Sequence, residues 1–505
     1  MLKQVKVVFI AIIILFIFYS LYLLAYLPLQ GEIKLTNDIG RDFLLLQELD
    51  QKKIVLIGPR SNTQGVFHGP LWTYVNYPAY LIGQGNPVIT AWFWVILGFI
   101  FLLSTFFILR RLFGTIESLL GVSLLSTYLV PHINSVFHAE VNFFLIPSFL
   151  YTIYSYLQTK KSKYLAFHIM ILAAFIHLNI GVGILFIMLS GALILGLIIK
   201  NKLWKHLIAF IILPIGVSNF IAFDFRHNFG MAKALFNLGG NSAFLVPLNE
   251  WVNDRINNTV SMQILAKNIE PLSVLIFALI IIFTFIHIKN NTKQKPLLLL
   301  LLFYYFGYMA LSYFNKGVIL YHYIYLLVPL TIIWLVTLSK GISRFIFIPL
   351  IFVVLFLNFN FAKNYISDTQ NNFIGKKLDS WISLKQVAKS VIEEQKGKEF
   401  GYFIYSPDAY AYQQRYAMLY SFKAARSNAF EYGKKGTTYV IASPPPPDNP
   451  YMGHQWWIEN KANIKITPVE IKNFKSGYIV QKFNLNTNEQ KIQHDPNIEL
   501  GLNFR

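Results

Sequence analysis

Eleven long apolar runs, separated by short clusters of lysine and arginine, most constrain how this chain of 505 residues can fold. A helix that crosses a bilayer needs about 20 mostly apolar residues. The runs cover residues 7–29, 87–109, 116–131, 137–157, 164–180, 182–199, 204–222, 271–288, 296–314, 318–338 and 343–359. The sequence therefore predicts an all-α polytopic membrane bundle of about eleven transmembrane helices.

The composition agrees with a membrane protein. Hydrophobic residues make up 55% of the chain and charged residues only 13%, whereas soluble domains carry about 25% charged residues. The formal net charge of +20 would suggest nucleic acid in a soluble protein. Here the basic residues lie between apolar runs and near the C-terminus, so we expect a bilayer partner and no nucleic acid. Cysteine is absent, which excludes thiol chemistry.

The basic clusters also predict the orientation. If every run spans the membrane, all the clusters between runs fall on one side, and basic loops are retained in the cytoplasm. The N-terminus is then cytoplasmic, in a multi-pass protein of the plasma membrane. A signal peptide is the alternative for the first run, but that run is too long and lacks a small-residue cleavage site. The clusters are Lys3 and Lys6, Arg110 and Arg111, Lys160 to Lys163, Lys200 to Lys205, Lys289 to Lys295, and Lys340 with Arg344.

Two domains are expected, because the composition changes near residue 360. Residues 1–360 form the membrane domain, and residues 361–505 form a small soluble α/β domain on the extracytoplasmic side. The predicted elements of the second domain are helices at 378–394 and 408–423, strands at 400–405 and 438–443, and a small sheet within 464–485. We expect this domain to shape the entry of a substrate, with Tyr402, Tyr405, Trp456 and Trp457 available to stack on sugar rings.

The first outer loop, residues 30–86, concentrates charge beside a membrane span. Asp38 and Asp42 are four residues apart, so a helix that starts near Asn37 places both on one face, with Arg41 beside them. One interpretation is an ordinary helix start, where acidic residues are favourable. The functional interpretation is a general base, or a carboxylate that orients a substrate hydroxyl, next to a cation that binds phosphate.

His68 lies at the other end of this loop. It precedes Pro70 and the amphipathic run from Leu71 to Ile82, whose tyrosines and Trp72 are typical of a membrane interface. The aromatic belt does not explain the histidine. We expect His68 to hydrogen-bond a sugar or a phosphate.

Further candidates lie on the same outer side. Arg226 and His227 are expected to contact a phosphate, with Asp224 orienting Arg226, and the alternative is an Asp–Arg pair that anchors a helix end. His322 begins a late span, where an ionisable residue is costly unless it has a role or a partner. A last group has no metal-binding spacing and is interpreted as an interfacial polar turn: His132, Asn134, His138 and Glu140.

Four motifs resemble one known family, the multi-spanning GT-C glycosyltransferases, and within it the protein O-mannosyltransferases and the lipid A aminoarabinose transferase. The resemblance covers about residues 1–360. It departs from the family at His68-Gly69-Pro70, where many relatives have Lys-Pro-Pro. The motifs are Asn-Asp-Ile-Gly-Arg-Asp at 37–42, His-Gly-Pro-Leu-Trp at 68–72, Arg-Arg-Leu-Phe-Gly at 110–114 and His-Tyr-Ile-Tyr-Leu-Leu-Val-Pro at 322–329.

This resemblance implies an enzyme that transfers a hexose or pentose. The donor would be a sugar linked to polyprenyl phosphate, the acceptor a hydroxyl of a glycan, lipid or protein, and the transfer inverting at the outer membrane face. Asp38 would then be the catalytic carboxylate. Arg41, Arg226 and His322 would neutralise the departing phosphate, and Asp42 would support Asp38 or hold a divalent cation such as Mg²⁺ or Mn²⁺.

Two other functions are compatible with the composition. A transporter or flippase for lipid-linked sugars predicts charges at mid-membrane depth and inverted repeats, and the sequence shows neither. A non-catalytic partner in polysaccharide assembly would leave Asp38 replaceable.

Overall fold

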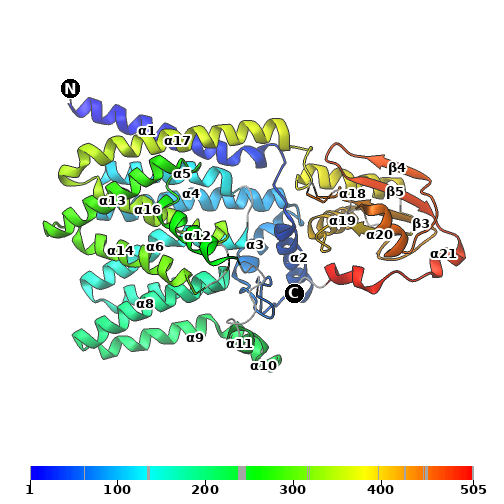
Figure 1. Cartoon of the computed structure of the whole chain (residues 1–505), viewed down its shortest axis with the longest axis horizontal. Coiled ribbons are helices and arrows are strands. Elements are labelled where there is room, and N and C mark those ends of the chain that lie inside the picture. The colour runs from blue at the N-terminus through cyan, green and yellow to red at the C-terminus, as the bar shows by residue number, and fades with distance from the viewer. Residues whose placement is uncertain are drawn as a thin grey trace.

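The computed structural model describes residues 2–61, 63–133, 137–236, 246–314, 317, 319–395, 397–425, 428–446, 448–449 and 453–502. Figure 1 shows a long helical bundle and a smaller domain with a sheet, and helix α2 (Asn37–Lys52) lies where the two meet. The chain is therefore mostly helical, and the polar outer loop occupies the junction.

Central helices of the bundle are buried on all sides, and peripheral helices expose apolar side chains. Every residue of α16 is buried, whereas Phe18, Ile96 and Phe285 are about half exposed, as expected of surfaces that face lipid. The bundle consists of α1 (Leu2–Leu29), α4 (Pro87–Leu112), α5 (Thr115–Ile133), α6 (Asn142–Thr159), α7 (Ser162–Leu178), α8 (Ile180–Asn201), α9 (Ile212–Gly216), α10 (Ser218–Arg226), α11 (Gly230–Phe236), α12 (Leu248–Ser261), α13 (Glu270–Lys289), α14 (Lys295–Ser312), α15 (Tyr321–Ile324), α16 (Leu327–Leu338) and α17 (Arg344–Asp368).

Seven of these helical segments are long and apolar enough to cross a membrane, within the part of the chain that the structure describes. An eighth is possible if Trp204–Gly216 and Ser218–Arg226 form one span, although they bend by 49°. All eleven apolar runs contain helix, but a count of eleven spans is not confirmed. The physical reason is length, because Thr115–Pro131 and Ser162–Leu178 are shorter apolar helices and a 17-residue helix is only about 26 Å long.

The C-terminal domain contains a five-stranded sheet in the order β2-β1-β3-β5-β4. The first three strands are parallel, and β5 and β4 add to them antiparallel. Residues of β1 and β3 alternate between two cores, since Tyr402 and Ile441 face α18 and α19, while Phe403 and Val440 pack with Ile458 of α20. The elements are α18 (Trp381–Gln395), β1 (Phe400–Tyr405), α19 (Tyr412–Ala425), β2 (Ala429–Glu431), β3 (Thr437–Ala442), α20 (His454–Asn460), β4 (Glu470–Asn473), β5 (Ile479–Asn484) and α21 (Thr487–Lys491).

This arrangement corrects one expectation about the aromatic residues. Tyr402 and Tyr405 are 1% and 6% exposed, because they lie on a strand that is buried along its whole length. They are core residues, so the prediction that they stack on sugar rings is wrong. Trp456 remains 62% exposed on α20.

The loop after α1 is joined to the C-terminal domain through its backbone. Leu35 N donates to the carbonyl of Asp379 at 2.7 Å, and Trp381 N donates to Ile33 O at 3.2 Å. The buried carboxylate of Glu32 accepts hydrogen bonds from Ser380 Oγ and from Ile33 N. These contacts hold the start of the outer loop against the start of α18, so the sheet domain forms part of the surroundings of α2.

Candidate active site

Helix α2 is packed between the bundle and the C-terminal domain. It begins after Thr36, whose backbone is extended, which confirms the helix start predicted near Asn37. The side-chain oxygen of Asn37 accepts a hydrogen bond from Tyr412 N of α19 at 2.7 Å. A Cβ atom at Gly40 would lie 2.6 Å from the backbone of Gln413, so the close approach of α2 and α19 requires a glycine here.

One face of α2 carries the predicted charged group. Arg41 Nη1 lies 3.2 Å from Asp38 Oδ1, and Arg41 Nη2 lies 3.7 Å from Asp42 Oδ1. The side chain of Asp38 is 59% exposed and that of Asp42 is fully buried. The spacing therefore brought the three residues together as expected, with one carboxylate open to solvent and the other beneath it.

The buried carboxylate has a partner that the sequence did not reveal. Asp42 Oδ2 lies 2.7 Å from His138 Nδ1, on the short 3₁₀ helix His138–Glu140. Burial raises the pKa of Asp42 to about 7, although Arg41 opposes this. Burial lowers the pKa of His138 to about 3, and the charge of Arg41 acts in the same direction. Burial therefore favours the uncharged form of both groups, with the proton on the Asp42 carboxyl and a neutral His138 ring.

His138 had been interpreted as part of an interfacial polar turn. It lies 96 residues from Asp42 in the chain, and its local sequence has no recognisable spacing. Only the packing of the bundle brings it to α2. Of the same group, Asn134 and the side chain of His132 lie outside the described residues.

His68 is fixed by a tight hairpin over residues 58–69. Gly58 N donates to His68 O, and His68 N donates to Pro59 O, both at 2.8 Å. Its Nδ1 accepts a hydrogen bond from Ile180 N at 3.2 Å, which leaves the proton on Nε2. The ring centroid lies 5.1 Å from that of His138. Burial first, then the charges of His138, Arg41 and His322, hold the pKa of His68 well below its ordinary value.

His68 is therefore a neutral ring in the site, and its Nε2 can donate a hydrogen bond. His322 of α15 is brought to the same region through Phe137, whose ring lies 4.5 Å from that of His138 and 5.6 Å from that of His322. Three parts of the chain that are distant in sequence therefore meet here: the first outer loop with α2 and the hairpin, the 3₁₀ helix, and α15.

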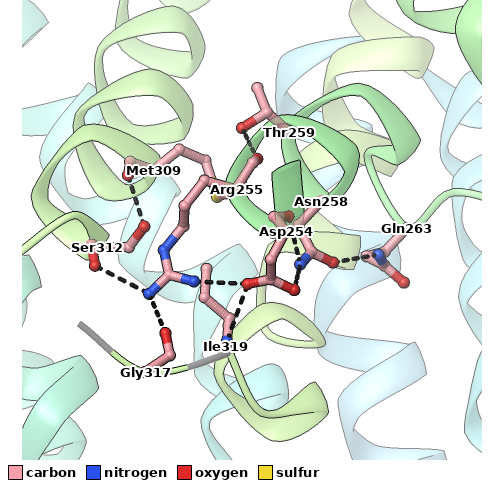
Figure 2. A network of polar contacts seen from close by, with 9 residues as sticks. All are labelled: Asp254, Arg255, Asn258, Thr259, Gln263, Met309, Ser312, Gly317 and Ile319. Atoms are coloured by element: carbon pink, nitrogen blue, oxygen red, sulfur yellow. Dashed lines mark hydrogen bonds and ion pairs between the residues drawn. The ribbon is translucent and has the colours of Figure 1, made fainter. Parts of the chain in front are cut away.

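A buried polar network supports the segment that leads to α15, as Figure 2 shows. Arg255 of α12 is fully buried and pairs with Asp254 at 2.5 Å. Its Nη2 donates to Gly317 O at 2.7 Å, and Ile319 N donates to Asp254 Oδ2 at 3.0 Å. The pair therefore fixes the backbone three residues before His322.

The second predicted charged group, Asp224 with Arg226 and His227, has a different character. The carboxylate of Asp224 accepts hydrogen bonds from Met231 N and Ala232 N at 2.8 and 2.9 Å. It therefore holds the start of α11, and within the described residues it forms no ion pair with Arg226. Arg226 and His227 are exposed. His227 stacks on Phe223 of its own helix, with centroids 4.1 Å apart.

In the described ranges there is no group of three or more histidine, aspartate or glutamate side chains arranged to hold a metal ion. Asp42, which the sequence offered as a ligand, instead faces His138 and Arg41.

No family model matches the sequence, and no curated protein matches it. Solved structures do match. ArnT from Cupriavidus metallidurans in the apo state is similar with a TM-score of 0.61 and 11% identity, over 97% of this chain and 99% of that chain. The same protein bound to undecaprenyl phosphate gives the same TM-score and identity, over 97% and 100%. An oligosaccharyltransferase from Archaeoglobus fulgidus gives a TM-score of 0.48 and 10% identity, over 86% of this chain and 68% of that chain.

Proposed function

Because the chain has the fold of the GT-C glycosyltransferases, we propose that it is a membrane glycosyltransferase. It takes a sugar from a polyprenyl-phosphate-linked donor and passes it to an acceptor hydroxyl at the outer membrane face. The observation that supports this best is Asp38, a solvent-reaching carboxylate held beside Arg41 at the end of the bundle. A structure that matches over the whole length holds undecaprenyl phosphate, which is the lipid carrier such a donor would leave behind.

Asp38 serves as the base or the acceptor-orienting carboxylate. It accepts the proton of the acceptor hydroxyl, whose oxygen attacks the anomeric carbon as the bond to the lipid phosphate breaks. Attack on the side opposite to the phosphate inverts the anomeric configuration. Its 59% exposure leaves room for an acceptor, whereas the buried Asp42 has none.

The side of the site that binds the leaving phosphate provides positive charge and hydrogen-bond donors. It consists of Arg41, His68 and His322. The leaving phosphate already carries charge, so it needs charge-assisted hydrogen bonds more than protonation. Arg41 provides a guanidinium that is almost fully buried, and His68 provides its Nε2 proton. Asp42 and His138 keep Arg41 in place from beneath.

We also propose the topology and the domain limits. The lysine clusters favour a cytoplasmic N-terminus. The bent pair Trp204–Gly216 and Ser218–Arg226, counted as one span, together with α5, α6 and α7, brings the seven spans to eleven, and residues 361–505 form an extracytoplasmic domain. Labelling of single cysteines introduced at Lys161, Lys293 and Asn449 in intact cells tests this. Only the third is expected to react from outside, and labelling at Lys293 would contradict the topology.

The activity test uses the purified full chain, polyprenyl-phosphate donors with different labelled sugars, and a panel of glycan, lipid and peptide acceptors. We expect labelled product with the anomeric configuration opposite to that of the donor, and free polyprenyl phosphate in equal amount. Arrival of intact donor on the far side of a proteoliposome, without cleavage, would instead identify a flippase.

A further inference from the structure

Arg60 lies outside the residues assigned above, in the 58–69 hairpin, where its backbone forms an isolated antiparallel bridge with Phe67. Its guanidinium carbon is 4.2 Å from the ring centroid of Tyr410, in the loop before α19. It is half-buried, and among the described residues it forms no ion pair with a carboxylate. Desolvating an arginine without an acidic partner is costly, so the geometry calls for an anion that arrives from outside the chain.

The C-terminal domain holds the arginine in one orientation. Tyr410 stacks on Tyr412, with centroids 5.3 Å apart and ring planes 11° apart. Asp408 accepts hydrogen bonds from the amides of Tyr410 and Ala411 at 3.1 and 3.2 Å. The alanines on either side of Tyr410, Ala409 and Ala411, have φ values of +63° and +52°. Such backbone is strained for an alanine and persists only where the surroundings enforce it.

The same stack connects Arg60 to the proposed catalytic helix. The amide of Tyr412 donates to Asn37 Oδ1, and Asn37 directly precedes Asp38. The charges of Arg60 and Arg41 both act to lower the pKa of Tyr412, against a larger effect of burial, so both guanidinium groups lie near this phenol. Arg41 has two carboxylates beside it, and Arg60 pairs with none in the part of the chain that the structure describes, which leaves the positive charge at Arg60 available.

We propose that Arg60, seated on Tyr410, is an anion-binding subsite beside Asp38 that takes a phosphate or carboxylate group of a substrate. This rests on the proposed function only for the identity of the substrate. The anion belongs either to the lipid phosphate of the donor or to an acidic acceptor. Tyr410 is a positioning residue, which gives the C-terminal domain a direct part in substrate recognition.

The test measures binding to the purified full chain, without turnover, using two probes. The first is undecaprenyl phosphate, and the second is glucose 6-phosphate compared with glucose. Arg60→Gln should weaken binding of one phosphorylated probe by about ten-fold or more, since a charge-assisted hydrogen bond contributes about 1.5–3 kcal/mol. Weaker undecaprenyl phosphate binding assigns the anion to the donor, and weaker glucose 6-phosphate binding with unchanged glucose binding assigns it to the acceptor.

Variants of Tyr410 test its positioning role. Tyr410→Leu should weaken binding of the same probe by about two- to five-fold, the usual effect of an exposed cation–π contact, and Tyr410→Phe should restore it. Lys435→Gln is the matched control, because Lys435 lies 4.1 Å from the ring of Phe430 but pairs with Glu399. This variant should leave the binding of both probes unchanged.

Two results would overturn the proposal. One is a wild-type chain that binds neither phosphorylated probe, or that binds glucose 6-phosphate and glucose equally and does not bind undecaprenyl phosphate. The other is Arg60→Gln with unchanged binding of both probes, which would make the Arg60–Tyr410 contact a purely structural link between domains. Failure to find any sugar transfer, with the binding effect intact, would count against the proposed function and leave the subsite standing.

Discussion

Two outer segments contain the same kinds of residue but have different structural surroundings. Asp38, Arg41 and Asp42 on α2 are held by α19 and the 3₁₀ helix at His138. The second segment consists of Asp224, Arg226 and His227 at the end of α10. Its hydrogen bonds are mainly to residues that are close in sequence. Charged composition alone does not distinguish the two groups. What distinguishes them is whether distant parts of the chain enclose the group, and the predictions below test that difference.

The largest effect is expected from Asp38→Asn. The change keeps the volume and removes one of the two ion pairs of Arg41, the one whose carboxylate is 59% exposed and screened by solvent. A general base cannot be replaced by an amide, so transfer should fall by about 10²–10⁴-fold while undecaprenyl phosphate binding stays. Single-turnover transfer and lipid binding are measured on the same preparation. Turnover near that of the wild type would mean that Asp38 is not catalytic and only stabilises the start of α2.

The next effect concerns the partner of Asp42. His138→Ala leaves a buried carboxylate without its hydrogen bond, which should lower the free energy of unfolding by about 1–3 kcal/mol. Thermal unfolding in detergent measures this, and transfer should fall less than in Asp38→Asn. His227→Ala is the control from the second segment, and a change there as large as that of His138→Ala would remove the distinction between the segments.

Gly40→Ala breaks the packing that encloses the first segment. The added Cβ would lie 2.6 Å from the Gln413 backbone, and overpacking of this kind costs about 1–3 kcal/mol. Because α19 and α2 must separate, we expect loss of transfer together with faster proteolytic release of the C-terminal domain. Gly191→Ala serves as the control, since a Cβ there meets nothing within 4 Å. Equal behaviour of the two variants would show that the domain contact does not support the site.

The sequence was sufficient for the features that depend on local spacing. It predicted the helix that brings Asp38, Arg41 and Asp42 to one face, and most of the C-terminal elements. It could not predict His138 as the partner of Asp42. The two residues are 96 positions apart, and the sequence of a polar turn does not show which distant residue the turn will contact. The inward position of Tyr402 and Tyr405 was missed for a related reason, since a strand buried on both faces shows no alternation.

The pH dependence of stability follows from Asp42. Its pKa is raised from 3.8 to about 7 in the folded chain, so folding takes up a proton and stability falls as the pH rises through 7. His138 acts oppositely, because its pKa is lowered from 6.5: its contribution is present above 6.5 and is lost as the pH falls below it. Between pH 6.5 and 8 the titration of Asp42 should lower the stability by about 1 kcal/mol, and His138 offsets part of this because its unfolded form still loses protons in that range.

Asp42→Asn removes that loss, so its unfolding midpoint should rise relative to that of the wild type between pH 6.5 and 8. Differential scanning of both proteins across this range gives the comparison. A difference between the two midpoints that does not change with pH would mean that Asp42 is already ionised in the folded chain throughout this range.

The smallest effect is expected from Arg226→Ala. The sequence predicted a phosphate contact for this residue, but its side chain is exposed on α10, and it forms no ion pair with another described residue. Exposed substitutions of this kind usually change stability by less than about 0.5 kcal/mol, and we expect binding of undecaprenyl phosphate to change by less than two-fold. Arg41→Ala, measured beside it, should weaken that binding by about ten-fold or more, because it removes a nearly buried charge-assisted donor. A drop of similar size in both variants would mean that α10 closes over the donor during binding, so that the two segments form one site after all.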